Sequence, residues 1–373
     1  MLACILQQQQ SHQCIATLRG HSSYVSGLAV DGEGEGSSLY VASSDGHIRL
    51  WPLDMAVGQN EVSCSTVAVT DSSVKCLVAT GNGVVSSHQD STIRVWRHDG
   101  RREGRRHLAL DAVLPTTVDC LCAFLLPGSY VEVRRHKKST WVHHVDAVTA
   151  LALSPDGAHM YSVSWDRSLK AWRLPSLRCA ESVAAAHDDA INAVVAAPDG
   201  NVYTGSADKT VKAWRRHPGQ KNLSLVSTME RHRSAVNALA LGVGGRVLYS
   251  GGCDRSVVVW EAAAGDSGRM VATGTLRGHA KAVLCLAAAG DMVYSGSADR
   301  TVRVWRREAT TAAHGYSCLA VLVGHGGAVK SLALLHGGAA CDRCCCGCAA
   351  VVCSGSLDGD VKLWKVTIST CDL

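Results

Sequence analysis

Residues 203–214 read YTGSADKTVKAW, and this segment decides the fold because variants of it recur along the chain. In it, Asp208 precedes Trp214 by six residues. The same spacing occurs in seven pairs, namely Asp45 and Trp51, Asp90 and Trp96, Asp166 and Trp172, Asp208 and Trp214, Asp254 and Trp260, Asp299 and Trp305, and Asp358 and Trp364. Seven copies at one spacing indicate internal repeats, each of which is one supersecondary unit.

A histidine upstream of the Asp–Trp pair extends the repeat. Six histidines stand four residues before a Val or Ile, namely His21, His144, His187, His232, His279 and His325. The second repeat departs from this pattern, because Thr70 stands four residues before Val74. Most neighbouring repeat tryptophans are 42 to 46 residues apart, which is enough for four short strands and their turns.

The chain resembles the WD-repeat family. The resemblance rests on the Asp and Trp of every repeat and on intact GH dipeptides at Gly20-His21, Gly278-His279 and Gly324-His325. It implies an all-β, seven-bladed propeller with four antiparallel strands per blade. Each repeat then supplies the outer strand of one blade and the three inner strands of the next. The strand around residues 14–18 should therefore pair beside residues 361–366 and close the ring.

The resemblance also implies a hydrogen-bonded chain of His, Ser or Thr, Asp and Trp across each blade. We assign its hydroxyl members two residues before the Asp, at Ser43, Ser164, Ser206, Ser297 and Ser356. The second repeat has His88 at this position and the fifth has Gly252, so we expect those two blades to be weaker. Six ring-related copies of a His–Asp–Ser set argue against catalysis, because an enzyme needs one site. We therefore expect a protein without enzymatic activity and without a cofactor.

Several segments resemble, more narrowly, the plant JINGUBANG-like WD-repeat proteins. They include SYVEVRRHKKSTWVHHVDAVTAL over 129–151, AHDDAINAV over 186–194 and RHRSAVNALAL over 231–241. This resemblance implies a scaffold or regulator with links to plant growth and pollen germination, and it supplies no ligand.

A loop-lined face of the propeller is the expected binding surface for other proteins. In WD repeats the contact residues tend to precede the turn Asp or to flank the Val after the GH dipeptide. Those positions are Tyr24, Lys75, Trp165, Asn192, Asn237 and Lys330. Trp165 is the strongest candidate, because a large aromatic residue just before a turn Asp suits a binding hot spot. The alternative is that Trp165 packs against the neighbouring blade. We expect the propeller itself to be monomeric.

A basic connector follows the second repeat. Trp96 and Trp172 are 76 residues apart, and we place an insertion at 97–129, between the last two strands of one blade. The stretches RHDGRREGRRH (97–107) and RRHKK (134–138) are strongly basic. An alternative function is therefore binding of nucleic acid or an acidic surface through 97–138. No aromatic residues on which bases could stack accompany the charge. We therefore favour a solvated loop beside an edge strand whose Lys and Arg residues discourage pairing with other strands.

A cysteine-rich loop over 336–350 contains CDRCCCGC. Its thiolates at Cys341, Cys344, Cys346 and Cys348 match the number of ligands in a zinc site. A second, well-separated pair of Cys or His residues is missing, so we favour a loop without metal. A loop that reacts with oxidants is the intermediate interpretation.

The composition excludes several classes of protein. A hydrophobic content of 47% rules out global disorder, and a net charge of +5 is too small to make nucleic acid the default partner. The 17 cysteines stand in a chain without a recognisable secretory leader, so we expect reduced thiols and a cytoplasmic or nuclear location. No apolar run reaches membrane-spanning length. We predict tails over 1–12 and 368–373 around a propeller over 13–367.

Overall fold

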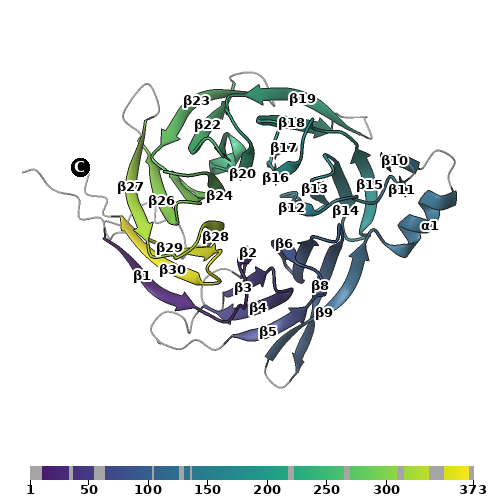
Figure 1. The fold of residues 1–373 in the computed structure, drawn as a ribbon, viewed down its shortest axis with the longest axis horizontal. Helices are drawn as coiled ribbons and strands as arrows, with labels where there is room; N and C mark the ends of the chain where they lie inside the picture. The colour runs from purple at the N-terminus through teal and green to yellow at the C-terminus, as the bar shows by residue number, and fades with distance from the viewer. Residues whose placement is uncertain are drawn as a thin grey trace, which may run out of the picture.

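The computed structural model describes residues 11–32, 37–53, 64–102, 105–125, 130–134, 137–216, 222–263, 269–308, 315–335 and 348–368. Within these residues the strands form seven four-stranded antiparallel sheets, arranged as blades around a common centre (Figure 1). In each blade the first strand lies nearest the centre and the last forms the outer edge. The predicted seven-bladed propeller is thereby confirmed.

We number the blades in chain order, and each contributes four strands from the inside outward. Blade 1 consists of β2 (Val25–Asp31), β3 (Ser38–Ser43), β4 (His47–Pro52) and β5 (Ser65–Val69). Blade 2 consists of β6 (Val74–Thr80), β7 (Gly83–His88), β8 (Ile93–Arg102) and β9 (Arg105–Leu114). Blade 3 consists of β12 (Val148–Leu153), β13 (His159–Ser164), β14 (Leu169–Arg173) and β15 (Arg178–Val183). Blade 4 consists of β16 (Ile191–Ala196), β17 (Asn201–Ser206), β18 (Thr210–Arg216) and β19 (Leu223–Glu230).

The remaining three blades follow the same order. Blade 5 consists of β20 (Val236–Leu241), β21 (Val247–Gly252), β22 (Ser256–Ala262) and β23 (Met270–Arg277), with a short 3-10 turn over Val243–Gly245. Blade 6 consists of β24 (Val283–Ala289), β25 (Met292–Ser297), β26 (Thr301–Arg307) and β27 (Tyr316–Val323). Blade 7 consists of β28 (Val329–Leu335), β29 (Cys348–Ser356), β30 (Val361–Ile368) and β1 (Ser11–Leu18).

The ring is closed by strands from opposite ends of the sequence. β1 pairs antiparallel with β30, and Cys14 lies opposite Trp364 in the register. β1 starts two residues inside the predicted N-terminal tail, and β30 ends one residue inside the predicted C-terminal tail. Because β1 occupies the outer edge of blade 7, no sheet edge is left open at the junction. The predicted closure is confirmed.

The insertion lies after blade 2 and not within it. β8 and β9 form a hairpin in which Trp96 faces Leu110, so residues 105–114 are the outer strand of this blade. The prediction that residues 97–129 separate the last two strands is therefore wrong. The extra chain consists of α1 (Thr117–Leu125) and the hairpin of β10 (Tyr130–Arg134) with β11 (Lys137–Thr140), outside the ring (Figure 1). The sequence obscured this because the outer strand lacks a repeat signature of its own.

Two contacts define how α1 begins and where it packs. The hydroxyl of Thr116 accepts the backbone N–H of Asp119 at 3.2 Å, which caps the first turn. The carboxylate of Asp119 in turn pairs with Nε of Arg178 on β15 at 3.3 Å. These bonds anchor the helix against the outer strand of blade 3. None of the helical segments in the described part of the chain has the length and apolar character of a membrane-crossing helix.

Adjacent blades contact each other where the second strand of one blade meets the innermost strand of the next. A Cβ added at Gly251 would lie 2.6 Å from Cγ1 of Val283, which is the first residue of the next blade. Gly296 is equally close to Val329, at 2.7 Å. Each of these glycines therefore leaves room for the valine of the following blade, and a larger residue there would clash with it.

Candidate interaction face and the polar network beneath it

The polar network is seen most simply in blade 4. Nδ1 of His187 lies 2.8 Å from the Asp208 carboxylate, and Nε2 lies 2.7 Å from Oγ1 of Thr204. The indole N–H of Trp214 donates to the same hydroxyl oxygen at 2.8 Å. Burial lowers the pKa of His187, which favours a neutral ring. The donors of the chain then all face the same way. The indole N–H donates to the hydroxyl, the hydroxyl donates to Nε2, and Nδ1–H donates to the carboxylate.

The hydroxyl members lie two residues upstream of those that the sequence suggested. They are the residues four before the turn Asp, namely Ser86, Ser162, Thr204, Ser250, Ser295 and Ser354. The assigned serines Ser43, Ser164, Ser206, Ser297 and Ser356 instead accept the backbone N–H of the Asp at 3.1–3.3 Å. Positions two apart on a strand share one face, and both are usually Ser here, so the pattern alone could not separate them.

The two blades that we expected to be weak have their indole and hydroxyl satisfied. In blade 5, Ser250 bonds both His232 and Trp260, so Gly252 removes nothing from the network. In blade 2, His88 at the end of β7 replaces the histidine that other blades supply from the loop before the innermost strand. Its Nε2 lies 2.8 Å from Ser86, which also accepts the indole N–H of Trp96 at 2.8 Å. The premise of the expected weakness, a missing hydroxyl, therefore does not hold in either blade.

The relocated histidine separates the turn carboxylate of blade 2 from the network. Nδ1 of His88 faces the Ser72 carbonyl at 3.4 Å and not the carboxylate of Asp90. Asp90 accepts instead from the N–H and hydroxyl of Thr92 and from Arg94. Burial, reinforced by the nearby charge of Arg94, lowers the pKa of His88 to about 4. Blade 2 thus also contains a neutral buried histidine, but this histidine faces a backbone carbonyl and not the turn carboxylate.

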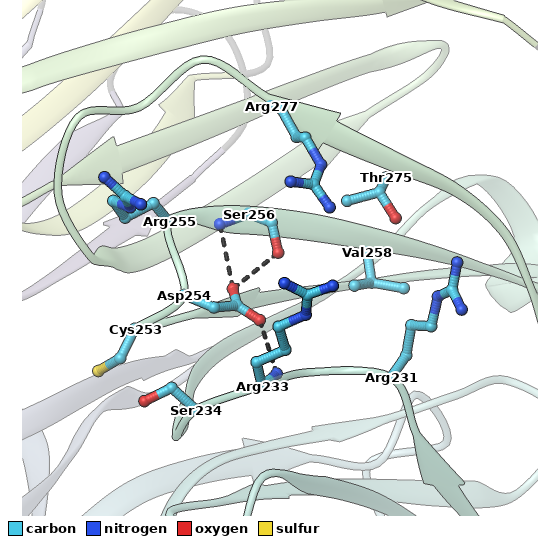
Figure 2. A pocket seen from close by; sticks show the side chains of 10 residues that line it. All are labelled: Arg231, Arg233, Ser234, Cys253, Asp254, Arg255, Ser256, Val258, Thr275 and Arg277. Carbon is cyan, nitrogen blue, oxygen red and sulfur yellow. Dashed lines mark hydrogen bonds between the residues drawn. The ribbon is translucent and has the colours of Figure 1, made fainter.

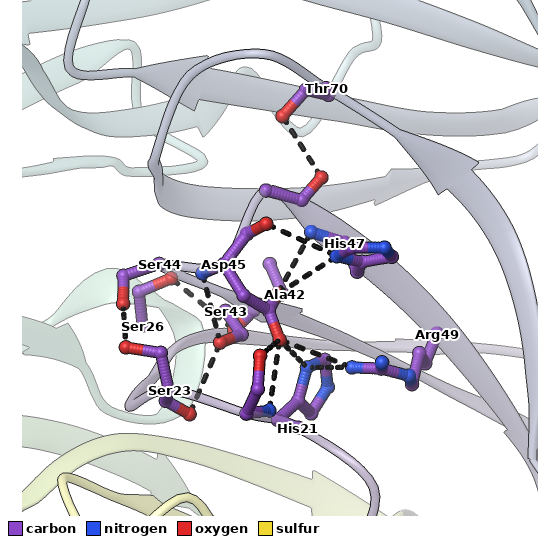
Figure 3. Close-up of polar contacts among 12 residues, drawn as sticks. His21, Ser23, Ser26, Ala42, Ser43, Ser44, Asp45, His47, Arg49 and Thr70 are labelled. Carbon is purple, nitrogen blue, oxygen red and sulfur yellow. Dashed lines mark hydrogen bonds and ion pairs between the residues drawn. The ribbon is translucent and has the colours of Figure 1, made fainter.

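Blade 1 is the blade whose network is broken. Val41 occupies the hydroxyl position, and within the described residues Nε2 of His21 and the indole N–H of Trp51 have no hydrogen-bond partner. Figure 3 shows Arg49 directed at His21 and at the carboxylate of Asp45, 3.3 Å away. Burial and the charge of Arg49 lower the pKa of His21 to about 4. The absence of this hydroxyl can be read from the sequence, once it is known that the hydroxyl residue stands four positions before the turn Asp.

The candidate contact residues of blades 1 to 4 form a continuous run, which we call the Trp165 arc (Tyr24, Lys75, Trp165 and Asn192). The ammonium of Lys75 lies over the indole of Trp165, 5.8 Å from its centroid. The indole N–H donates to Oδ1 of Asn192 at 3.3 Å. Burial opposes ionisation of Tyr24, but the charge of Lys75 and hydrogen bonds with Lys75, Ser73 and Ser44 together lower its pKa. Trp165 as a whole residue remains 42% exposed.

The other candidate residues lie farther round the ring. The amide of Asn237 donates to the carbonyl of Val283 in the next blade at 2.9 Å. Lys330 is exposed on β28, and its charge partly offsets the burial that raises the pKa of Cys285 to about 12. Asn237 is therefore engaged in joining two blades, whereas Lys330 presents a charge near the inner strands.

Asn192 also joins blades, and its replacement tests that role. Its amide donates to the buried carbonyl of Val236 at 2.9 Å while its oxygen accepts from Trp165. We expect Asn192→Ala to lower the free energy of unfolding by about 1–3 kcal/mol, because this carbonyl is left unsatisfied. Urea unfolding measures the change. Trp165→Phe removes only the exposed indole bond, and an equal loss in both variants would contradict the bridging role.

Parts of the remaining predicted sites lie outside the described residues. This applies to the side chains of the cysteine-rich loop, Cys341, Cys344, Cys346 and Cys348, and to Arg101, Arg102, Arg105 and Arg106 of the basic connector. Of the described connector residues, Arg97 pairs with Asp111 on β9 at 2.9 Å. In the described part of the chain, no three His, Cys, Asp or Glu residues are grouped as a metal site would require.

Comparison with known proteins agrees with this architecture. The model of the WD domain, G-beta repeat, matches residues 12–52, 135–173, 180–215, 223–261, 270–306 and 316–365. The unmatched stretch over 53–134 contains blade 2, where the histidine is relocated. The crystal structure of the WD40 beta propeller domain of Doa1 matches with a TM-score of 0.66 and 19% identity, over 95% of this chain and 97% of that one. This likeness concerns the fold.

Two curated proteins are similar in sequence. The nuclear distribution protein nudF of Aspergillus niger is 25% identical over 288 residues, which cover 70% of this chain and 55% of nudF. The 66 kDa stress protein of Physarum polycephalum is 25% identical over 304 residues, which cover 68% of this chain and 49% of that protein. The chain thus spans about half the length of these relatives.

Proposed function

Because the chain belongs to the WD-repeat family, whose propellers typically serve as protein-interaction scaffolds, we propose that it is a non-enzymatic scaffold that binds partner proteins through the Trp165 arc. The narrower resemblance to the plant JINGUBANG-like proteins extends the proposal to a regulator of growth or pollen germination. The cytoplasm and the nucleus are the proposed compartments, with a monomeric propeller as the acting form.

The exposed but immobilised indole of Trp165 carries the proposal. An aromatic side chain that is fixed before binding loses little conformational entropy when a partner covers it. Here Asn192 fixes one edge of the ring, and Lys75 covers part of its face. The alternative interpretation, that Trp165 packs against the neighbouring blade, explains its hydrogen bond with Asn192. It does not explain why 42% of the residue stays exposed. Such large, ordered aromatic residues are enriched among binding hot spots.

The polar networks support the absence of catalysis. In the six blades with a hydroxyl at this position, the hydroxyl residue is fully buried, so a substrate cannot reach it as a nucleophile. For the alternative function, nucleic-acid binding through 97–138, Arg97 is the one arginine whose side chain the structure describes, and it pairs with Asp111.

Replacement of Trp165 tests the proposed surface. We expect Trp165→Ala to weaken capture of the partners recovered by the wild-type chain by tenfold or more, as truncation of a hot-spot residue costs about 2 kcal/mol or more. Quantitative affinity purification measures the loss, and Lys75→Ala should reduce capture less strongly. Thermal unfolding should shift by only a few degrees, because the indole is largely outside the core.

Leu357→Ala is the matched control. Leu357 also precedes a turn Asp, in blade 7, and it is 48% exposed. We expect this variant to retain its partners. An unchanged set of partners with Trp165→Ala would show that binding occurs on another face.

A further inference from the structure

One cationic position of the repeat is missing in blade 5. Two residues before the blade tryptophan, six blades carry a basic residue, namely Arg49, Arg94, Lys170, Lys212, Arg303 and Lys362. The corresponding residue of blade 5 is Val258. The substitution replaces a long charged side chain by a short apolar one at an otherwise regular place in the ring.

The basic residues of the other blades fill space beside the segment that precedes the inner strand. Nζ of Lys212 donates to the carbonyl of Ala186 at 2.9 Å, one residue before the network histidine. The side chains of Arg303 and Lys362 lie against Gly278 and Gly324, which occupy that same place in their blades. A small residue and a long cation therefore accompany each other in these blades.

Blade 5 reverses this arrangement and leaves a pocket of about 490 Å³ (Figure 2). Val258 is short, and Arg231 stands one residue before the network histidine, where Ala186, Gly278 and Gly324 are small. The pocket lining includes four arginines, Arg231, Arg233, Arg255 and Arg277, together with Val258 and Thr275. Figure 2 shows the side chains of Arg231, Arg233 and Arg277 around Val258 and Thr275, while Arg255 extends to the other side of Asp254.

The pocket has a net positive charge, because four arginines and a single carboxylate, that of Asp254, line it. Both carboxylate oxygens of Asp254 are engaged, one by His232 and the backbone N–H of Arg233, and the other by the N–H and hydroxyl of Ser256. Among the described residues, none of the four lining arginines forms a side-chain hydrogen bond or ion pair. Unpaired guanidinium groups at a concave surface are suited to bidentate recognition of a compact anion.

We propose that this blade 5 pocket binds a phosphate monoester, held by Arg231, Arg233 and Arg277 above Val258, with the hydroxyl of Thr275 as a further donor. The monoester belongs either to a phosphorylated side chain or to a phosphorylated small molecule, and both present the same dianionic group. Cys253 has the place in blade 5 that Trp165 has in blade 3, so part of the pocket lining lies at the same end of its blade as Trp165. The site does not depend on the proposed function of that arc.

Val258→Lys is the decisive variant. It restores the cation that six blades carry and fills the pocket, but it removes no arginine and adds a positive charge. Binding of inorganic phosphate to the full chain is measured by isothermal titration calorimetry, with chloride at equal ionic strength as the reference. We expect the variant to bind phosphate at least tenfold more weakly. Equal or tighter binding would overturn the proposal, because it would show attraction by charge without a pocket.

Removal of the arginines provides the complementary test. We expect Arg233→Gln with Arg277→Gln to weaken phosphate binding at least tenfold. The control, Arg167→Gln with Arg300→Gln, loses the same charge from the turns of blades 3 and 6 and should bind within twofold of the wild-type chain. Equal losses in the two pairs, or no binding of phosphate beyond that of chloride, would refute the site.

Two further probes distinguish the sources of the phosphate group. One is a tripeptide containing phosphoserine, and the other is glycerol phosphate. Tighter binding of the peptide than of inorganic phosphate supports a phosphorylated protein as ligand, and tighter binding of glycerol phosphate supports a small molecule. If both bind at least tenfold more weakly than inorganic phosphate, the pocket does not admit a monoester and the proposal is wrong.

Discussion

Thr204→Val is expected to lower the free energy of unfolding by about 2–4 kcal/mol, because it leaves two buried groups without partners, each at a cost of about 1–3 kcal/mol. These groups are Nε2 of His187 and the indole N–H of Trp214, which lie 2.7 and 2.8 Å from the threonine hydroxyl. Valine preserves the volume of the side chain, so a cavity does not contribute. Urea unfolding followed by tryptophan fluorescence measures the loss.

Blade 1 offers the reverse substitution as a control. Val41 occupies the place of Thr204, and the His21 and Trp51 groups above it lack partners within the described residues. Val41→Thr supplies one hydroxyl to both and is expected to raise the free energy of unfolding by about 1 kcal/mol. If both substitutions destabilise the chain to the same extent, volume and packing decide the stability at this position, and the hydrogen-bond explanation is wrong.

Acid is expected to destabilise the propeller well before its carboxylates are protonated. The pKa values of His21 and His88 are about 4 in the folded chain, mainly because burial disfavours the imidazolium ion. An unfolded histidine has a pKa of about 6.5. Above that pH the full stability is present. As the pH falls toward 4, the unfolded chain binds protons that the folded chain excludes, and each histidine costs up to about 1.4 kcal/mol per pH unit.

The carboxylates extend this loss to lower pH. Although burial opposes ionisation of Asp299, hydrogen bonds from Thr301 and His279 keep its pKa at about 2. Its stabilising contribution is present above the ordinary aspartate pKa and disappears as the pH falls toward 2. Urea midpoints between pH 7 and 4.5 isolate the histidine contribution. His88→Gln should lower the number of protons that the chain takes up on unfolding in this pH range by about one. A midpoint that stays constant from pH 7 to 4.5 would contradict neutral buried histidines.

The ring could be predicted from the sequence because its signals are repeated. Seven Asp–Trp pairs at one spacing indicated the number of blades, and the position of residues 14–18 indicated how the ring closes. The location of the insertion could not be predicted, since the outer strand β9 has no residue that recurs in the other repeats and is defined by its pairing with β8. Pairing between strands is a tertiary property that a single repeat does not encode.

The candidate site was predictable only in part. Trp165 stood out because the other turns have small or polar residues or a leucine before the Asp. Its fixation by Asn192 depends on how blades 3 and 4 meet, which no local pattern reports. Likewise, His88 replaces a histidine that other blades supply from a loop, and only the fold shows that both places reach the same serine. The basic pocket follows from Val258, a single departure from a repeated cation.

The pairing of β1 with β30 has a consequence for biosynthesis. The paired residues Cys14 and Trp364 are 350 positions apart, so the two strands leave the ribosome at widely separated times. At the usual rates of translation the interval is roughly 20–70 seconds. During that interval β1 has no partner strand and the nascent chain has exposed backbone donors and acceptors. Cellular yield should therefore depend on chaperones that shield the early strand until the last one emerges.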